Sequence, residues 1–152
     1  MRFFLVLISA ILVAALAGCA ASGPAFSPAA PPASDQTLVY IYRAHTIVGS
    51  AVRASFAIDG TAAADVNVEG YTRFYVKSGY RTMSVSYAAF PERHRAVHFP
   101  PGTTIYLKFL TGSSPGEAGG TRFSYAIQEV PPTTASREIV PFKFQPPAKD
   151  LF

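Results

Sequence analysis

The fold is decided by the stretch Val52-Arg53-Ala54-Ser55-Phe56-Ala57-Ile58-Asp59-Gly60. Its apolar residues recur at every second position, which is the period of a β-strand with one buried face. The dipeptide Asp59-Gly60 then supplies the positive φ that a tight hairpin turn needs. We therefore expect a strand that turns back into an antiparallel neighbour.

The same period of two continues on both sides of this stretch, and helical periodicity is absent. Turn signals separate further β-prone runs at 38–42, 63–68, 71–76, 80–87, 97–99, 105–109 and 123–127. About seven or eight short strands at this spacing predict a sandwich or a small barrel. Uneven strand lengths, and apolar groups on both faces of several strands, favour the sandwich. We expect an all-β fold, a single antiparallel β-sandwich.

The chain has one cysteine, Cys19, at the end of an apolar run that begins at Phe3 and follows the positive charge of Arg2. The motif Leu16-Ala17-Gly18-Cys19 resembles a lipobox, at which bacterial lipoprotein signal peptides are cut after acylation of the cysteine. The resemblance implies cleavage between Gly18 and Cys19. The alternative is a retained membrane-spanning helix, which needs about 20 apolar residues. Small residues at the cut favour a signal peptide.

The lipoprotein resemblance also implies a location in the cell. Cys19 would carry diacylglyceryl and acyl chains that hold the protein to a membrane of the cell envelope. The next residue is Ala20 rather than the aspartate that usually retains such proteins at the inner membrane, which implies the periplasmic face of the outer membrane. The net charge of +4 is mild and the basic residues are scattered, so no nucleic-acid partner is expected.

Composition divides the chain into four parts. These are a signal peptide (1–18), the lipidated cysteine with a flexible Pro/Ala-rich linker (19–36), the β-sandwich domain (37–130) and a Pro-rich C-terminal extension (131–152). The linker has nothing with which to make a core, so we expect it to hold the domain off the membrane without fixing its orientation. Residues 139–144 are a possible edge strand, because Pro141 suits an edge but not a central strand.

Strand and turn motifs follow one another in a definite order within the domain. They are Tyr40-Ile41-Tyr42-Arg43, Ile58-Asp59-Gly60, Gly70-Tyr71, Val76 with Gly79, Pro101-Gly102 and Ile105-Tyr106-Leu107. In this order the chain resembles a family of small bacterial lipoproteins and periplasmic domains of unknown function, similar to carboxypeptidase-regulatory or transthyretin-like β-sandwiches. The resemblance covers residues 38–129 and implies the fold, but no activity and no catalytic residues. The chain departs from the family at Ser78-Gly79, where Pro-Gly is usual, and in its Pro-rich end.

The strongest candidates for metal ligands are Glu92, His94 and His98, because histidine and carboxylate groups bind zinc or copper. The spacing of the two histidines suits a helix, whereas the local pattern predicts a strand. Arg93 and Arg95 would also repel a cation. We favour surface histidines and no cofactor, and keep a metal-binding protein or enzyme built on this cluster as the alternative.

The residues His45, Ser50 and Asp59 supply the types of a hydrolase triad, but no Gly-x-Ser-x-Gly motif is present. Asp59 is better explained as a turn residue. We therefore expect no catalytic residues and a protein that is not an enzyme.

Eight tyrosines and no tryptophan make an exposed tyrosine strip the first choice for a binding face. We assign it to Tyr42, Arg43, Arg73 and Tyr75. We favour tyrosines that cover the rim of the core, and keep this strip as the first choice if the domain has a binding face. Unpaired strand edges are a second route to binding. The expected function is a lipid-anchored periplasmic binding or scaffolding module, or an accessory subunit, with an envelope protein or peptidoglycan as its partner.

Overall fold

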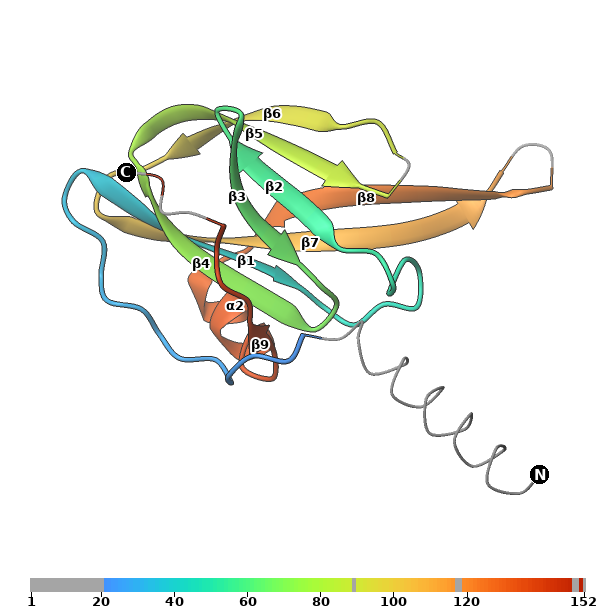
Figure 1. Cartoon of the computed structure of the whole chain (residues 1–152), viewed down its shortest axis with the longest axis horizontal. Coiled ribbons are helices and arrows are strands. Elements are labelled where there is room, and N and C mark those ends of the chain that lie inside the picture. The colour runs from blue at the N-terminus through green and yellow to red at the C-terminus, as the bar shows by residue number, and fades with distance from the viewer. Residues whose placement is uncertain (1–20, 89, 117–118, 149–150, 152) are drawn as a thin grey trace, which may run out of the picture.

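Two β-sheets pack face to face in the computed structural model, which describes residues 21–88, 90–116, 119–148 and 151 (Figure 1). The predicted all-β sandwich is confirmed. The predicted signal peptide, its cleavage site between Gly18 and Cys19, and the predicted lipidation of Cys19 lie outside the described residues.

The elements follow the chain in a simple order. They are β1 (Gln36–Arg43), β2 (Ala54–Ile58), β3 (Thr61–Val66), β4 (Gly70–Lys77), β5 (Gly79–Tyr87), β6 (Arg93–Phe99), β7 (Thr103–Pro115), β8 (Thr121–Glu129), α2 (Pro132–Glu138) and β9 (Lys143–Phe144). One sheet has five strands in the order β8-β7-β1-β4-β9, and the other has four in the order β3-β2-β5-β6. The strands β8 and β6 therefore each end a sheet.

Most strand pairs are antiparallel, but two are not. Strand β1 lies parallel to β7, with Val39 opposite Ile105, and β4 lies parallel to β9. The whole four-stranded sheet intervenes in the chain between β1 and β7. The purely antiparallel prediction is corrected here, because hairpin signals report only pairs that are neighbours in sequence.

The core between the sheets follows the alternation that the sequence predicts. In β2, Ala54, Phe56 and Ile58 are buried, and the residues between them are half-buried. Asp59 and Gly60 have φ values of 48° and 77°, as the hairpin signal predicts. The inner faces of both sheets thus form one continuous apolar layer.

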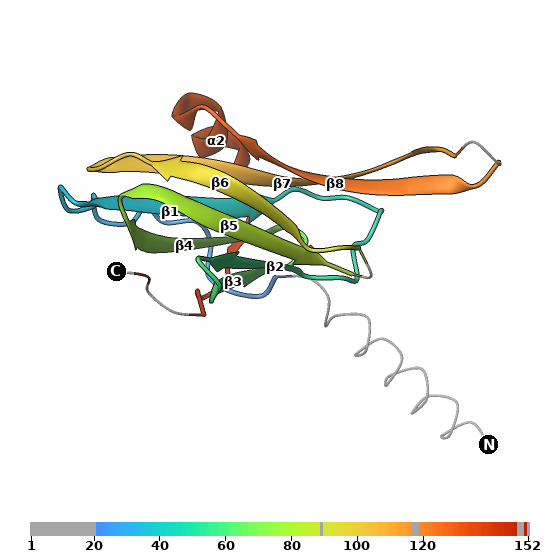
Figure 2. The same ribbon diagram turned by 90° about the horizontal axis from the view of Figure 1, so that it is seen from above.

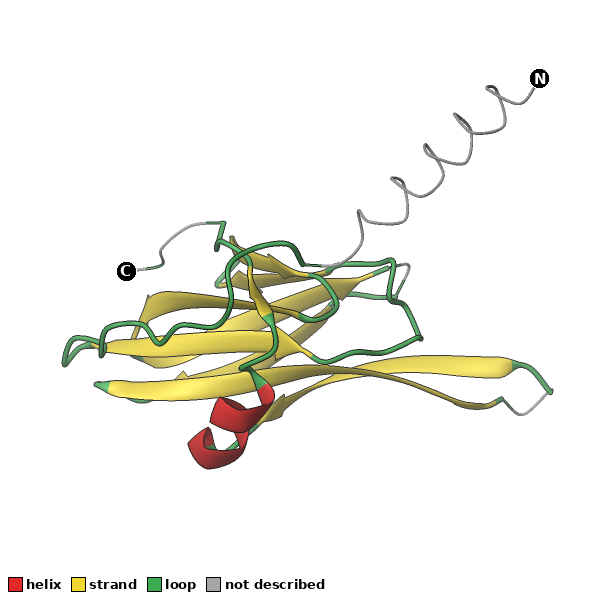
Figure 3. Cartoon of the chain, turned by 90° about the horizontal axis from the view of Figure 1, so that it is seen from below, coloured by secondary structure: helices red, strands yellow, loops and turns green. Residues whose placement is uncertain are grey.

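A second apolar cluster covers the outer face of the five-stranded sheet. Its buried members are Leu38, Tyr40, Tyr42, Tyr71, Val130, Ala135, Ile139 and Phe142. Seven of the eight residues of β1 are buried, so this central strand is covered on both faces. Figure 3 shows the helix α2 lying against the outside of the sheet.

The helix α2 is not predicted by the sequence. It starts with Pro132 at its first turn, where proline needs no hydrogen-bond donor, and Ala135 and Ile139 face the sheet one turn apart. Seven residues are too few for a stable isolated helix, so packing must hold it. Beyond the helix, Lys143–Phe144 form β9 at the edge of the five-stranded sheet. This short strand lies within residues 139–144, where the sequence indicates a possible edge strand.

Residues 21–35 form what we call the N-terminal strap, and here the structure differs from the flexible linker predicted for 19–36. Phe26 packs on the rings of Tyr40 and Tyr71. The backbone N–H of Ala29 donates to the Tyr40 hydroxyl at 2.8 Å, and Tyr75 Oη donates to the Ala30 carbonyl at 2.8 Å. The linker prediction is corrected because an extended Pro-rich segment can dock on aromatic side chains without forming its own core.

The hairpin of β7 and β8 projects beyond the other strands, as Figure 2 shows from above. Residues 112–115 continue β7 as a strand and pair with residues 121–124 of β8. The projection leaves Phe123 50% exposed.

Candidate binding groove

A groove of about 350 Å³ opens where the edge strands of the two sheets face each other. Its walls come from β6 and β8, and β5 supplies part of its floor. Apolar side chains line it together with two arginines: Met83, Val85, Tyr125 and Ile127, with Arg93 and Arg95. The volume lies at the lower end of the range of ligand pockets, about 300–1,000 Å³.

The floor of the groove is apolar and rigid. Met83 and Val85 are buried positions of β5 that belong to the main core. The Tyr125 hydroxyl donates to the Val85 and Pro91 carbonyls at 3.2 and 2.9 Å, which fixes its ring. Burial raises the pKa of Tyr125, with Arg93 acting against it, so the phenol stays neutral at physiological pH.

Two guanidinium groups give the groove a positive charge. Arg93 Nη1 donates to the Tyr125 carbonyl at 3.1 Å, and its guanidinium carbon lies 4.6 Å from the Tyr125 ring centroid. None of the ion pairs between described residues includes Arg93 or Arg95. The charge is therefore available to an anionic ligand.

The strands beside the groove have free edges. Among the described strands, β6 pairs with β5 alone and β8 pairs with β7 alone. Their outer backbone groups can therefore pair with another chain. Phe123 lies on the same face of β8 as Tyr125 and Ile127, by the two-residue period, and extends the apolar surface along the hairpin.

The tyrosine face predicted from the sequence is not open. Tyr42 and Arg43 are both 0% exposed, and Arg43 points into the core between the sheets. Arg73 Nη1 donates to the Ser27 carbonyl, and Tyr75 also contacts the strap. The prediction of one open binding face at these residues is wrong. The core between the sheets encloses Arg43, α2 covers Tyr42, and the strap occupies the hydrogen-bonding groups of Arg73 and Tyr75.

The outer-face polar groups form a small network instead. Tyr42 Oη donates to Glu138 Oε2 at 2.7 Å, and Lys108 Nζ donates to the same oxygen at 2.9 Å. Burial and the Glu138 carboxylate raise the pKa of Tyr42. The hydrogen bond from Lys108, followed by that from Tyr42, lowers the pKa of Glu138. The network fastens α2 to β1 and β7.

Arg43 holds a loop rather than a ligand. Its Nη2 donates to the Gly49 carbonyl at 2.7 Å, and its Nη1 donates to the Val52 carbonyl. The guanidinium lies 5.2 and 5.5 Å from the ring centroids of Tyr87 and Phe109. Burial lowers the pKa of Arg43, and the Tyr87 hydroxyl acts against this. The guanidinium stays charged, since arginine keeps its proton in proteins.

The candidate metal residues do not come together as a ligand set. His94 Nε2 lies 3.8 Å from Glu92 Oε2, but the ring of His98 packs in a tilted arrangement against Tyr80 at a centroid distance of 4.6 Å. Four strand positions separate the two histidines by about 13 Å. Across the described residues there is no group of three His, Cys, Asp or Glu side chains that could hold a metal ion.

One serine–histidine contact is not predicted by the sequence. Ser84 and His94 are cross-strand partners, and Ser84 Oγ lies 2.8 Å from His94 Nδ1, with Glu92 on the other ring nitrogen. The residue types are those of a triad. Ser84 is only 4% exposed, however, so its hydroxyl cannot reach a substrate. The contact serves to pair β5 with β6.

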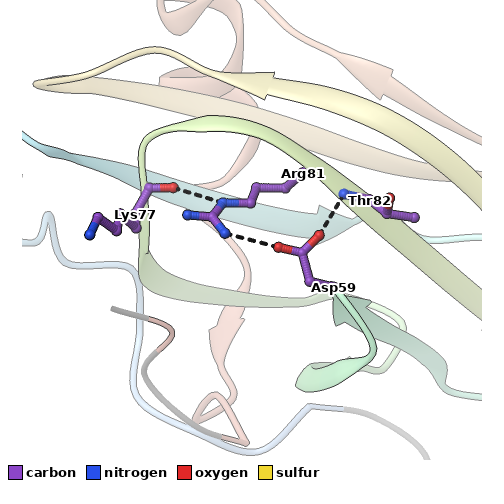
Figure 4. Close-up of polar contacts among 4 residues, drawn as sticks. All are labelled: Asp59, Lys77, Arg81 and Thr82. Atoms are coloured by element: carbon purple, nitrogen blue, oxygen red, sulfur yellow. Dashed lines mark hydrogen bonds and ion pairs between the residues drawn. The ribbon is translucent and has the colours of Figure 1, made fainter.

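Two residues of the triad considered from the sequence, His45 and Asp59, each contact other partners. His45 Nδ1 lies 3.4 Å from Glu69 Oε1. Figure 4 shows Asp59 accepting a 2.8 Å hydrogen bond from the Thr82 backbone N–H and pairing with Arg81 Nη1 at 3.1 Å. The Thr82 bond, and after it Arg81, lowers the pKa of Asp59. Asp59 is thus a structural turn residue.

Comparisons with family models, with curated proteins and with solved structures gave no match. Within the part of the chain that the structure describes, no helix is both long and apolar enough to cross a bilayer.

Proposed function

We propose that this protein is a lipid-anchored binding or scaffolding module of the bacterial cell envelope, and that it holds its partner in the groove between β6 and β8. The lipobox motif ending at Cys19 supports the anchor. One observation carries the binding role: an apolar floor lies between two free strand edges, beside two arginines that pair with no carboxylate of the described residues.

The chemistry of the groove favours an extended, acidic segment of another envelope protein. A strand added to β6 or β8 would satisfy the free backbone groups and send alternate side chains onto the floor. Acidic side chains would pair with Arg93 and Arg95, and a bidentate guanidinium–carboxylate pair adds specificity. A peptidoglycan strand offers no matching ladder of backbone hydrogen bonds, which makes a protein the preferred partner.

The proposal is tested by affinity capture of the acylated protein after crosslinking in intact cells. We expect one dominant envelope protein with the unmodified chain, and its loss with Arg95→Glu. The matched control is Arg137→Glu, which makes the same charge change on the exposed side of α2, and it should keep the partner. Cys19→Ala tests the anchor and should lose the partner.

Two outcomes would contradict the proposal. Capture of the same protein by the Arg95→Glu chain would show that the groove does not bind the partner. Capture of peptidoglycan fragments in place of a protein would overturn the added-strand mode of binding.

A further inference from the structure

We infer that one particular end of the sandwich rests on the lipid surface, namely the end formed by residues 44–53 and the β3–β4 turn at 67–70. The inference relies on the lipid anchor of the proposed function. It goes further because it says how the anchored domain is oriented and which residues meet the lipid.

The first described residues are fastened to this end. The Ala21 backbone N–H donates to the Val68 carbonyl at 3.4 Å. Ala25 forms a β-bridge with Lys143, and the Phe144 N–H donates to the Pro24 carbonyl at 2.8 Å. A Cβ atom on Gly23 would lie 1.8 Å from the Phe144 carbonyl oxygen, so the strap and β9 are in close contact.

Strand β9 in turn fixes the position of the strap along the sheet. Its Lys143 pairs with Gly70 and its Phe144 with Tyr71, at the first residues of β4. From there the strap runs along the outer face to the other end of β4, where the Asp35 carbonyl accepts from the Ser78 N–H at 2.9 Å. Because the strap is docked along the sheet, residues 21–35 do not act as a free tether between the domain and the membrane anchor.

Little chain remains between the strap and the anchor. Cys19 and Ala21 are two residues apart in the sequence. An extended chain covers at most about 3.6 Å per residue, which gives a reach of about 7 Å. A lipid-bearing Cys19 therefore holds this end of the sandwich against the headgroups, whereas a free linker over 19–36 would leave the domain's orientation open.

The same end carries an exposed apolar side chain on a well-fastened loop. Ile47 is 88% exposed. The loop around it is held by Arg43 at Gly49, and by Thr111, whose hydroxyl donates to the Val48 carbonyl at 3.1 Å. The Glu69 N–H donates to the Arg43 carbonyl at 3.0 Å, which joins this loop to the β3–β4 turn. A large apolar residue held rigidly beside a lipid anchor suits the membrane interface.

The opposite end of the sandwich provides a matched control. Tyr80 is 80% exposed and follows the eight residues of β4, which span about 25 Å. If the strap end rests on lipid, Tyr80 lies well away from the headgroups.

The test uses the full-length acylated protein in vesicles of phosphatidylethanolamine and phosphatidylglycerol that carry nitroxide-labelled headgroups. A thiol-reactive fluorophore is attached to Ser50→Cys, in the exposed loop beside Ile47, or to Tyr80→Cys. We expect severalfold stronger quenching at position 50 than at position 80. Equal quenching at the two positions in protein that floats with the vesicles would overturn the inference and leave the anchor intact.

Two further arms separate the possible causes. A chain without added cysteines that takes up the thiol label and does not float would show an unacylated Cys19, which overturns the anchor and the inference together. Insertion of about 12 Gly/Ser residues after Ala20 lengthens the tether by roughly 20 Å. Quenching at position 50 should then fall toward that at position 80, and unchanged quenching would contradict the short-tether argument.

Discussion

Arg43 and Tyr87 share one hydrogen-bond acceptor inside the sandwich, the carbonyl oxygen of Gly49. Arg43 Nη2 donates to it at 2.7 Å and Tyr87 Oη at 3.0 Å, and Nη2 also lies 3.1 Å from the hydroxyl. A Cβ on Gly49, whose φ is +70°, would lie 1.6 Å from that hydroxyl, so the contact depends on glycine. A buried positive charge is thus stabilised by carbonyl groups and aromatic rings, and it fastens loop 44–53.

Replacement of this arginine should destabilise the fold strongly. Arg43→Met leaves the Val52 carbonyl without its donor and removes one of the two donors to the Gly49 carbonyl, and we expect the free energy of unfolding to fall by about 3 kcal/mol. Urea denaturation measures the change. The control is Arg53→Met, which removes an exposed pair with Asp65 and should cost less than about 0.5 kcal/mol. Equal stability of the two variants would contradict this role of Arg43.

The network at Glu138 should make stability depend on pH. Because the Lys108 and Tyr42 hydrogen bonds lower the pKa of Glu138, its carboxylate stabilises the native state at neutral pH. This contribution is lost as pH falls from the ordinary value of about 4.3 through the lower native value. Glu138→Gln should cost about 1 kcal/mol at pH 7, a figure reduced for partial exposure, and the difference should shrink toward pH 3.

Urea denaturation of both chains at pH 7, 5 and 3 tests this expectation. Glu129→Gln, at an exposed position of β8, is the control and should change stability little at any of these pH values. A cost of Glu138→Gln that stays constant down to pH 3 would show that the charge has no part in it.

The turn residue Asp59 should show the same sign of pH dependence on a smaller scale. Its pKa is lowered by the Thr82 hydrogen bond and by Arg81, so its contribution is present at neutral pH and is lost below about pH 4. Asp59→Ala should cost about 1 kcal/mol, because it removes the acceptor and places alanine at positive φ. Asp59→Asn keeps an acceptor and tolerates this conformation. Its thermal unfolding temperature should therefore lie between those of the unmodified chain and of the Asp59→Ala variant. An alanine variant more stable than the asparagine variant would refute the turn role.

Because Phe26 packs the strap against the sheet, we expect its removal to lower the stability of the protein. Phe26→Ala removes the contacts with Tyr40 and Tyr71 and should lower the free energy of unfolding by about 2 kcal/mol. Hydrogen exchange at the Ala29 amide, which is bonded to Tyr40, should speed up. The exposed Pro31→Ala is the control. Unchanged exchange in the Phe26→Ala chain would mean that the segment behaves as a free linker.

The sequence was sufficient for the strands and turns that depend on neighbouring residues. Phe56 lies on the predicted face, and Asp59 lies in the predicted turn. The parallel pairing of β1 with β7 could not be predicted, because it joins segments separated by a whole sheet. The strap had an indirect signal in β1, where Leu38, Tyr40 and Tyr42 alternate with apolar neighbours, so both faces needed cover.

The groove also has a signal in the sequence of β6. Arg93 and Arg95 occupy the same face of β6 as Val97 and Phe99, so two charges point toward the core side of an edge strand. Inward charges of this kind can also guard an open edge against self-association. Binding and protection make different predictions for what lies beside this edge in the cell.

The most direct test of the binding role places a photo-crosslinking amino acid at Ile127, in the groove, in the full-length protein in intact cells. Ser136, exposed on α2, is the control position. We expect one dominant crosslinked envelope protein from position 127, which is absent from position 136 and lost when Arg95→Glu is added. Crosslinking at position 127 that does not exceed that at position 136 would overturn the binding role of the groove, and would leave the arginines with the role of protecting an open edge.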